Sequence, residues 1–277
     1  MRKFIPEIES SGLSIVGPVR EDNQDSIHVP DELLPAGHGI LSAIADGMGG
    51  YAHGGMASVL ALKSFFEVVT SQNGSPILRT LQRGVEAANF SVYQKARQMD
   101  AGRMGTTLTA AYILGDMLYL AHVGDSRAYL IRDGRPICLT ADHTTVGDMV
   151  RSKLISADKI RTHAQRSVLT KSIGTDLFIQ PDITQHKLKA GDFLILCSDG
   201  LWSVIEDDEF ANIVNDYSSS VAEISQNLID LALAHHTDDN VSVVVLSLRK
   251  FSPVFVEQEQ HPEESLGWFK KLRKFVS

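Results

Sequence analysis

The sequence predicts an α+β fold: a four-layer sandwich of two mainly antiparallel β-sheets flanked by helix pairs. Its segments come in blocks, with strands, two helices, more strands, two helices and a last strand. This order does not alternate as βαβ units do, which disfavours a doubly wound parallel sheet. Two sheets packed face to face, with the helices outside, would bury the apolar sides of both helix pairs.

The first half of the chain supplies short strands and one helix pair. Strands are expected at 13–17, 26–29 and 40–45, and the last leads into a glycine-rich turn at 46–55. The segments 56–69 and 77–99 carry apolar residues at intervals of three and four, which is the spacing of one helix face. Both segments are therefore predicted to be helices.

The second half is predicted to hold hairpins, a flap, a second helix pair and a closing strand. The strand-like segments are 106–114, 117–123, 126–132, 136–140, 178–188, 193–197 and 241–248, and helices are expected at 207–214 and 221–235. Short links at 115–116, 124–125 and 133–134 favour antiparallel hairpins. The polar stretch 144–166, with a short helix at 146–154, interrupts the strands as a flap would.

Length and composition indicate one domain at 1–250, followed by a different segment at 251–277. Sandwich folds of 277 residues are often one unit, and 43% hydrophobic residues suffice for a core. The last segment combines an acidic linker with a basic amphipathic end. On a helix, Trp268 and Leu272 would share an apolar face opposite Arg273, which suits a partner groove or an anionic membrane surface. The alternative is a helix that docks on its own domain or frays.

Charge and cysteine content restrict the partners and the compartment. A formal net charge of -8 argues against nucleic acid as the main partner, because such binding relies on Lys and Arg. Cys138 and Cys197 are too few for a disulfide framework. No signal peptide or membrane-spanning apolar run is evident. We expect a cytoplasmic protein, and we expect a monomer.

Four aspartates lie where an apolar run meets a turn: Asp46, Asp125, Asp199 and Asp239. Strand ends fix side chains on a rigid scaffold, so these carboxylates are candidates to converge. Two carboxylates about 4 Å apart repel by roughly 4 kcal/mol at an effective dielectric constant near 20, and protonation or a multivalent cation relieves that repulsion. All-oxygen ligation suits Mg²⁺ or Mn²⁺, and no HExxH or paired Cys/His spacing points to zinc.

Two further segments carry candidate site residues. Asp46 is suited to bridge two ions, and Gly47, which lacks a Cβ, can turn its carbonyl toward one of them. The simpler interpretation is a flexible turn, and no Lys-Ser/Thr follows as a P-loop needs. Arg20 and Asp25 offer a guanidinium for phosphate oxygens beside a ligand for metal-bound water, although an ordinary charged loop has the same composition.

Seven short motifs occur in a fixed order along the chain. They are Arg-Glu-Asp-Asn-Gln-Asp from 20, Asp-Gly-Met-Gly-Gly from 46, Met-Gly-Thr-Thr from 104, Val-Gly-Asp-Ser-Arg-Ala-Tyr-Leu from 123, Leu-Thr-Ala-Asp-His-Thr from 139, Cys-Ser-Asp-Gly-Leu-Trp from 197 and Asp-Asp-Asn-Val-Ser-Val from 238. In this order the chain resembles a bacterial-type member of the protein phosphatase 2C family over about 13–248. The resemblance implies a β-sandwich flanked by helix pairs and a metal-dependent protein serine/threonine phosphatase.

The resemblance also implies roles for the acidic residues. Asp46 would bridge two ions, and the Gly47 carbonyl would serve one of them. Asp199 and Asp239 would complete the other, while Asp25 would hold a metal-bound water. The ions would activate a water that attacks phosphorus directly.

Further roles implied by the resemblance concern a third ion and the substrate. Asp125 together with Asp199 would bind a third ion of bacterial members, with Ser167 as an extra ligand. Arg20 would grip the substrate phosphate, which makes Arg20 and Asp46 the predicted catalytic residues. The flap at 144–166 would lie beside the site.

The chain departs from the family pattern at a few positions. Met48 stands where animal members have a histidine general acid, so protonation of the leaving group would fall to water. Tyr51 and Gly55 replace a His and a Glu common in bacterial members, which predicts altered tuning rather than lost activity. Three loop histidines are alternative proton donors, although such residues are more often merely solvated: His53, His143 and His163.

We therefore predict hydrolysis of phosphoserine and phosphothreonine in proteins phosphorylated by a Ser/Thr kinase, with Mn²⁺ or Mg²⁺ as cofactor. The alternative is a catalytically silent phosphoprotein-binding domain of the same fold, suggested by Tyr51 and Gly55. A nucleotide-binding enzyme would need a Lys or an acidic ribose partner in register, and none is present. Neither Cys138 nor Cys197 begins the Cys-x5-Arg loop of a cysteine-dependent phosphatase.

Overall fold

The computed structural model describes residues 3–30, 39–49, 53–71, 75–102, 104–217 and 220–254. Its strands are β1 (Lys3–Ile15), β2 (Asp25–His28), β3 (Ile40–Gly49), β4 (Met104–Thr106), β5 (Leu108–Leu114), β6 (Met117–Val123), β7 (Arg127–Arg132), β8 (Arg135–Cys138), β9 (Asp182–Lys187), β10 (Phe193–Cys197) and β11 (Val241–Val254). Within the described residues, one sheet has the order β1-β11-β10-β7-β8. The other has the order β2-β3-β5-β6-β9, with β4 paired to β3.

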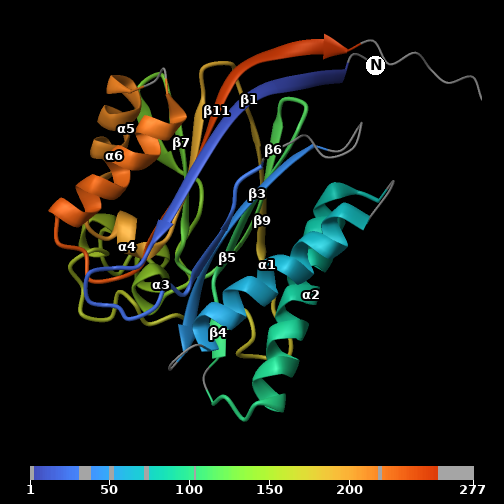
Figure 1. The fold of residues 1–277 in the computed structure, drawn as a ribbon, viewed down its shortest axis with the longest axis vertical. Coiled ribbons are helices and arrows are strands. Elements are labelled where there is room, and N and C mark those ends of the chain that lie inside the picture. The colour runs from blue at the N-terminus through green and yellow to red at the C-terminus, as the bar shows by residue number, and fades with distance from the viewer. Residues whose placement is uncertain are drawn as a thin grey trace, which may run out of the picture.

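Helix pairs cover the outer faces of the two sheets (Figure 1). Helices α1 (His53–Ser71) and α2 (Ile77–Gln98) pack on the six-stranded sheet, and α5 (Asp207–Asp216) and α6 (Val221–Ala234) pack on the five-stranded sheet. The flap carries α3 (Thr145–Arg151) and a 3₁₀ turn (Ala157–Lys159), while α4 (Asp199–Trp202) is a single turn after β10. The predicted α+β four-layer sandwich is confirmed.

Strand β10 shows how one sequence pattern fills two layers. Leu194 and Leu196 belong to the core between the sheets, whereas Ile195 and Cys197 belong to the core under α5 and α6. Side chains along a strand point alternately to opposite faces, so a continuous apolar run marks a strand that is buried on both sides. Cys197 is fully buried here as a small hydrophobic residue.

The hairpin predicted across the link at 124–125 is wrong, and this link contains the candidate site residue Asp125. The β5–β6 and β7–β8 pairs are antiparallel neighbours as expected, but β6 and β7 lie in different sheets. The link at 124–125 therefore carries the chain from one sheet to the other. Gly124 has φ +108, and a Cβ there would lie 2.5 Å from Thr107 Cγ2, so this crossing requires glycine.

The glycine-rich turn expected at 46–55 is also wrong for the described residues of that range, 46–49 and 53–55. Strand β3 continues to Gly49 and pairs there with β4, and Gly54 already belongs to the first turn of α1. A Cβ on Gly47 would lie 2.1 Å from the Gly54 carbonyl oxygen. Gly47 is thus needed for close approach between β3 and α1.

The last strand is longer than predicted. β11 pairs with β1 from Val241 to Val254, so the expected domain boundary at 250–251 falls inside a strand. The acidic linker and the amphipathic end predicted for 251–277 lie outside the described residues from 255 onward, as does Tyr51. In the described part of the chain, no helix is long and apolar enough to span a membrane.

The core between the sheets yields a stability prediction. Leu194 is fully buried there, so Leu194→Ala should lower the free energy of unfolding by about 2–5 kcal/mol through lost transfer energy and a cavity. Leu154→Ala, at a flap position that is 74% exposed, should change it by less than about 0.5 kcal/mol. Urea unfolding measures both, and equal effects would contradict the assigned core.

Candidate metal centre

Residues from six separated segments meet around one cavity of about 620 Å³. The candidate residues that line it are Arg20, Asp46, Gly47, Asp125, Ser167, Asp199 and Asp239. They come from the loop before β2, from β3, from the link after β6, from the position directly after the flap, from α4 and from the residue pair before β11. The fold thus gathers acidic groups that are up to 193 residues apart in sequence, because Asp46 and Asp239 share this wall.

Asp25 lies behind this cavity rather than in its lining. It pairs with Asp46 across the β2–β3 ladder and is 8% exposed. The Ser242 hydroxyl donates a 2.6 Å hydrogen bond to Asp25 Oδ2. The other carboxylate oxygen, Oδ1, is buried without a hydrogen-bond partner among the described residues.

Two threonines that sequence reasoning left without a role hold the backbone of Asp46. Thr107 Oγ1 accepts the Asp46 N–H at 2.8 Å, and Thr106 Oγ1 donates to the Asp46 carbonyl at 2.8 Å. Thr107 Oγ1 also shares a 2.7 Å hydrogen bond with Ser126 Oγ, beside the sheet-to-sheet link. The Met-Gly-Thr-Thr motif was the available signal for this support.

Asn240 fixes the loop that carries Arg20, and sequence reasoning also missed it. Its Oδ1 accepts from the Gln24 N–H at 2.9 Å, and its Nδ2 donates to the Asp22 carbonyl at 3.0 Å. Asp239 Oδ1 accepts the Asn240 N–H at 2.8 Å, while Asp239 Oδ2 accepts from Arg20 Nη2 at 2.6 Å. Arg20 and Asp239 are therefore direct partners, with the arginine side chain half exposed.

Asp199 begins the single-turn helix α4 directly after β10. The next residue, Gly200, allows this turn to lie against β11, since a Cβ there would be 2.0 Å from the Asn240 carbonyl oxygen. Like one oxygen of Asp25, Asp199 Oδ1 is buried and has no hydrogen-bond partner among the described residues.

Mutual repulsion and burial perturb the carboxylates. Burial, followed by the charges of Asp25 and Asp199, raises the pKa of Asp46 well above its usual range. Burial and Asp199 likewise raise the pKa of Asp125. Burial is also the main cause that raises the pKa of Asp25 to about 6 and that of Asp199 to about 7. A cation is thus needed to keep the whole cluster ionised near neutral pH.

The donor set fits a hard divalent cation. A buried carboxylate oxygen without a partner is costly, and Asp25 and Asp199 each present one. No group of three or more Asp, Glu, His or Cys side chains among the described residues is arranged to hold an ion by itself, so backbone oxygens and water would have to contribute to the coordination. Mg²⁺ usually retains several waters, whereas structural zinc sites are closed by Cys and His.

The predicted proton donors have different surroundings. Met48 lines the cavity, but His53, His143 and His163 do not. The expectation that His143 is solvated is wrong: it is 1% exposed, stacks on His122 and accepts the Gly124 N–H at 3.1 Å. His143 therefore supports the backbone next to Asp125.

Comparisons with known proteins bear on the whole domain. A family model described as Protein phosphatase 2C matches residues 20–234. Serine/threonine protein phosphatase PstP of Mycobacterium tuberculosis is 37% identical over 230 residues, which cover 83% of this chain and 43% of that relative. Protein phosphatase PhpP of Streptococcus pneumoniae is 31% identical over 246 residues, which cover 88% of this chain and 98% of the relative.

A solved structure with bound metal is similar as well. The catalytic domain of serine threonine protein phosphatase PstP in complex with two manganese ions has a TM-score of 0.76 and 33% identity, over 88% of this chain and 99% of that one. The match to the full mycobacterial relative covers only 43% of that protein, so this chain spans less than half of its length.

The raised pKa values predict how the metal-free protein responds to pH. Asp199 titrates near 7 in the folded chain and near 3.8 when unfolded, so the native state binds more protons between these pH values. Its contribution to stability is present below about pH 4 and is lost as the pH rises through about 7. In EDTA, the free energy of unfolding should therefore fall relative to that of Asp199→Asn over this interval, as measured by urea unfolding.

Asp199→Asn serves as the reference because a buried histidine, His122, changes the stability with pH in the opposite direction. Burial lowers the pKa of His122 to about 4, which makes stability rise with pH between about 4 and 6.5 in both proteins. Subtracting the two profiles removes the histidine. If the free energy of unfolding had the same pH dependence in wild type and in Asp199→Asn, the assignment of Asp199 to a buried cluster of repelling carboxylates would be contradicted.

Proposed function

This chain is a member of the protein phosphatase 2C family, and on that basis we propose that it hydrolyses phosphoserine and phosphothreonine in proteins with Mn²⁺ or Mg²⁺ as cofactor. The observation that carries the proposal is the ring of carboxylates around one cavity, with a buried and unpartnered oxygen on both Asp25 and Asp199. The similarity to bacterial serine/threonine protein phosphatases and the two manganese ions of one similar structure support it.

Each acidic residue receives a proposed role. Asp46 would help to hold two ions, the Gly47 carbonyl would serve one of them, and Asp199 and Asp239 would serve the other. Asp25 orients a water from behind the cavity, where Ser242 fixes its carboxylate. When bound, the two ions supply an acidic water as nucleophile and positive charge for the phosphoryl oxygens.

We propose that Asp125 and Asp199 would hold a third ion, with Ser167, directly after the flap, as an additional ligand. All three residues line the same cavity, and the charge of Asp199 contributes to the raised pKa of Asp125. This closeness of like charges supports a cation between them.

Arg20 is proposed to bind the substrate phosphate. Its guanidinium lines the cavity and donates one hydrogen bond, from Nη2 to Asp239, while half of the side chain is exposed. A planar guanidinium has further donors that match phosphate oxygens in pairs. Arg20 thus links a proposed metal ligand to the position of the phosphoryl group.

A cysteine nucleophile is not part of this proposal. Full burial raises the pKa of the Cys197 thiol, and partial loss of hydration raises that of Cys138, which lies at an exposed position of β8, so neither is a thiolate near neutral pH. Neither residue lines the carboxylate cavity. Water is therefore the proposed nucleophile and also the proposed proton source for the leaving group, since Met48 occupies the corresponding wall.

The remaining proposals concern the setting of the protein. We place it in the cytoplasm as a monomer that acts on substrates of a Ser/Thr kinase, and its net charge of -8 disfavours nucleic acid as a partner. We propose that the phosphatase domain runs to the end of β11 at Val254, with the flap at about 144–166, and that the segment after it contacts a partner or membrane surface through its basic amphipathic end.

Removing one carboxylate tests the metal centre. Asp46→Asn and Asp199→Asn should each abolish manganese-dependent release of phosphate from a phosphopeptide, because a charged ligand is lost, while circular dichroism shows an intact fold. The matched control is Asp216→Asn on the exposed end of α5, which should retain full activity.

Retained turnover in both site variants would refute the metal assignment. A wild-type protein that binds a phosphopeptide but releases no phosphate from a small aryl phosphate with manganese would favour the catalytically silent alternative.

Replacing the phosphate-binding arginine should act mainly on affinity. Arg20→Gln should lower kcat/KM for a phosphopeptide by about 10- to 100-fold at saturating Mn²⁺, since charge-assisted hydrogen bonds to phosphate are lost. Arg20→Lys should recover only part, because an ammonium cannot bind in the same paired geometry. Arg135→Gln, at an exposed position of β8, is the control, and an unchanged KM in Arg20→Gln would exclude this role.

A further inference from the structure

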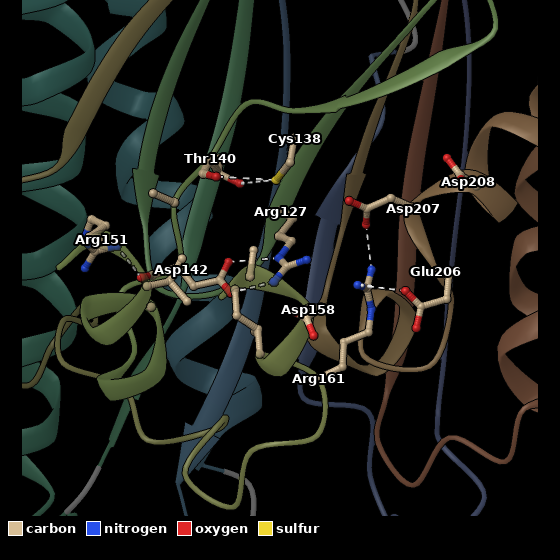
Figure 2. A pocket seen from close by; sticks show the side chains of 15 residues that line it. Arg127, Cys138, Thr140, Asp142, Arg151, Asp158, Arg161, Glu206, Asp207 and Asp208 are labelled. Atoms are coloured by element: carbon tan, nitrogen blue, oxygen red, sulfur yellow. Dashed lines mark hydrogen bonds and ion pairs between the residues drawn. The ribbon is translucent and has the colours of Figure 1, made fainter. Parts of the chain in front are cut away.

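The cavity between the flap and the start of α5 has its arginines paired within the domain (Figure 2). It measures about 440 Å³, and the three arginines that line it each have a carboxylate partner: Arg127 with Asp142, Arg151 with Asp148, and Arg161 with Asp207. An anionic ligand would have to displace one of these carboxylates. The buried side-chain atoms that lack a partner among the described residues lie instead in the carboxylate site, on Asp25 and Asp199.

The two carboxylate oxygens of Asp25 have different surroundings. Oδ2 accepts the 2.6 Å hydrogen bond from the Ser242 hydroxyl, whereas Oδ1 is buried without a hydrogen-bond partner among the described residues. The last torsion of an aspartate side chain has a broad, roughly twofold profile, so the side chain itself does not restrict rotation of the carboxylate. The groups that hold Oδ2 therefore decide where Oδ1 points.

Ser242 is hydrogen-bonded to the neighbouring strand. It lies directly opposite Ser14 in the β1–β11 ladder, and the two hydroxyl oxygens are 2.7 Å apart. An ionised carboxylate only accepts hydrogen bonds, so the single hydroxyl proton of Ser242 is used on Asp25. The proton between the two serines must then come from Ser14.

Asn23 closes this chain into a ring. Its Nδ2 donates to Ser14 Oγ at 2.8 Å, and its Oδ1 accepts the Asp25 N–H at 3.1 Å. Because a backbone N–H can only donate, it fixes which end of the Asn23 amide is the oxygen. The side-chain donors thus run in one direction, from Asn23 through Ser14 and Ser242 to Asp25, and hydrogen bonds in such a series polarise one another.

Ser14 and Asn23 are not part of the cavity wall. Neither lines the carboxylate cavity, and they belong to β1 and to the loop before β2. An effect of either side chain on the reaction would therefore pass through Asp25. Ser14 also lies outside the seven sequence motifs, so no local pattern marked it.

We propose that Ser14 and Asn23 are positioning residues that act through Ser242 and aim the unpartnered oxygen of Asp25 at the water on its cavity side. This inference rests on the proposed phosphatase function, in which Asp25 orients that water. The ring acts on the water rather than on the substrate, so its effect should not depend on the group that carries the phosphate.

The test removes single hydroxyl groups from the ring. Ser14→Ala deletes one link, Ser14→Thr keeps a hydroxyl on a residue type that suits a strand, and Ser242→Ala deletes the contact to Asp25. Ser10→Ala is the matched control, because Ser10 lies on the same strand and its Oγ donates to the Pro30 carbonyl at 2.8 Å, outside the ring. Values of kcat and KM are measured at saturating Mn²⁺ for an aryl phosphate and for a phosphopeptide.

The ring predicts a change in kcat with little change in KM. For both substrates, kcat should fall about threefold to tenfold in Ser14→Ala and roughly tenfold or more in Ser242→Ala, since each variant loses a hydrogen bond of the series. Ser14→Thr should recover most of the loss, and Ser10→Ala should stay within about twofold of wild type. Combining Ser14→Ala with Ser242→Ala should slow the reaction no further than Ser242→Ala alone.

Urea unfolding in EDTA gives a readout that does not involve activity. Burial raises the pKa of Asp25 to about 6, so above this pH the carboxylate is ionised and the series keeps its direction. Ser14→Ala should then raise the unfolding constant by a larger factor in wild type than in Ser242→Ala, because the second background has already lost the hydroxyl that Ser14 contacts. Equal factors in the two backgrounds would show that the ring is not a connected series and would overturn the proposal.

Two kinetic results would also overturn the proposal. A kcat in Ser14→Ala equal to that of Ser10→Ala would show that the ring does not affect the reaction. A loss confined to KM, or to one of the two substrates, would show that Ser14 acts on substrate binding instead of on the water. If Ser242→Ala does not fold, Ser14→Ala, Ser14→Thr and Ser10→Ala decide the question. A wild-type protein that releases no phosphate from either substrate would instead refute the phosphatase function, and this inference with it.

Discussion

The repulsion among five buried or half-buried aspartates is the constraint on which the rest of this structure depends. Asp25 and Asp46 face each other across a strand pair, and Asp125, Asp199 and Asp239 share the cavity wall. Left without a counter-charge, such a cluster keeps protons, as the raised pKa values of Asp25 and Asp199 indicate. With divalent cations the same groups are ligands. Clustering the carboxylates lowers the stability of the folded state, and bound ions would raise that stability again.

The scaffold meets this constraint with backbone contacts instead of compensating charges. Thr106 and Thr107 hold the peptide groups of Asp46, and Asn240 ties the Arg20 loop to β11. Glycines at 47, 124 and 200 allow main chains to approach within distances that a Cβ would prevent. Rigid support of this kind keeps acidic side chains in place whether or not an ion neutralises them. Arg20 is the one basic side chain that directly pairs with a site carboxylate among the described residues.

Local patterns in the sequence predicted the layers and the convergence of four strand-end aspartates, because period-two runs and acidic residues at strand ends are local signals. These local patterns gave wrong predictions where contacts between residues far apart in sequence determine the structure. The two-residue link at 124–125 has hairpin length, yet β6 and β7 belong to opposite sheets. The glycines after Asp46 suggested a turn, but strand β3 continues through Gly49 and pairs there with β4. His143 sits in a polar segment and is nevertheless buried against His122.

Anomalous diffraction from a crystal soaked in Mn²⁺ tests the central claim most directly. The account predicts strong manganese peaks between Asp46, Asp199 and Asp239, within coordination distance of their oxygens, with a water facing Asp25. A soaked crystal of the folded protein with no peak in this cavity would contradict the claim that divalent cations neutralise the clustered aspartates.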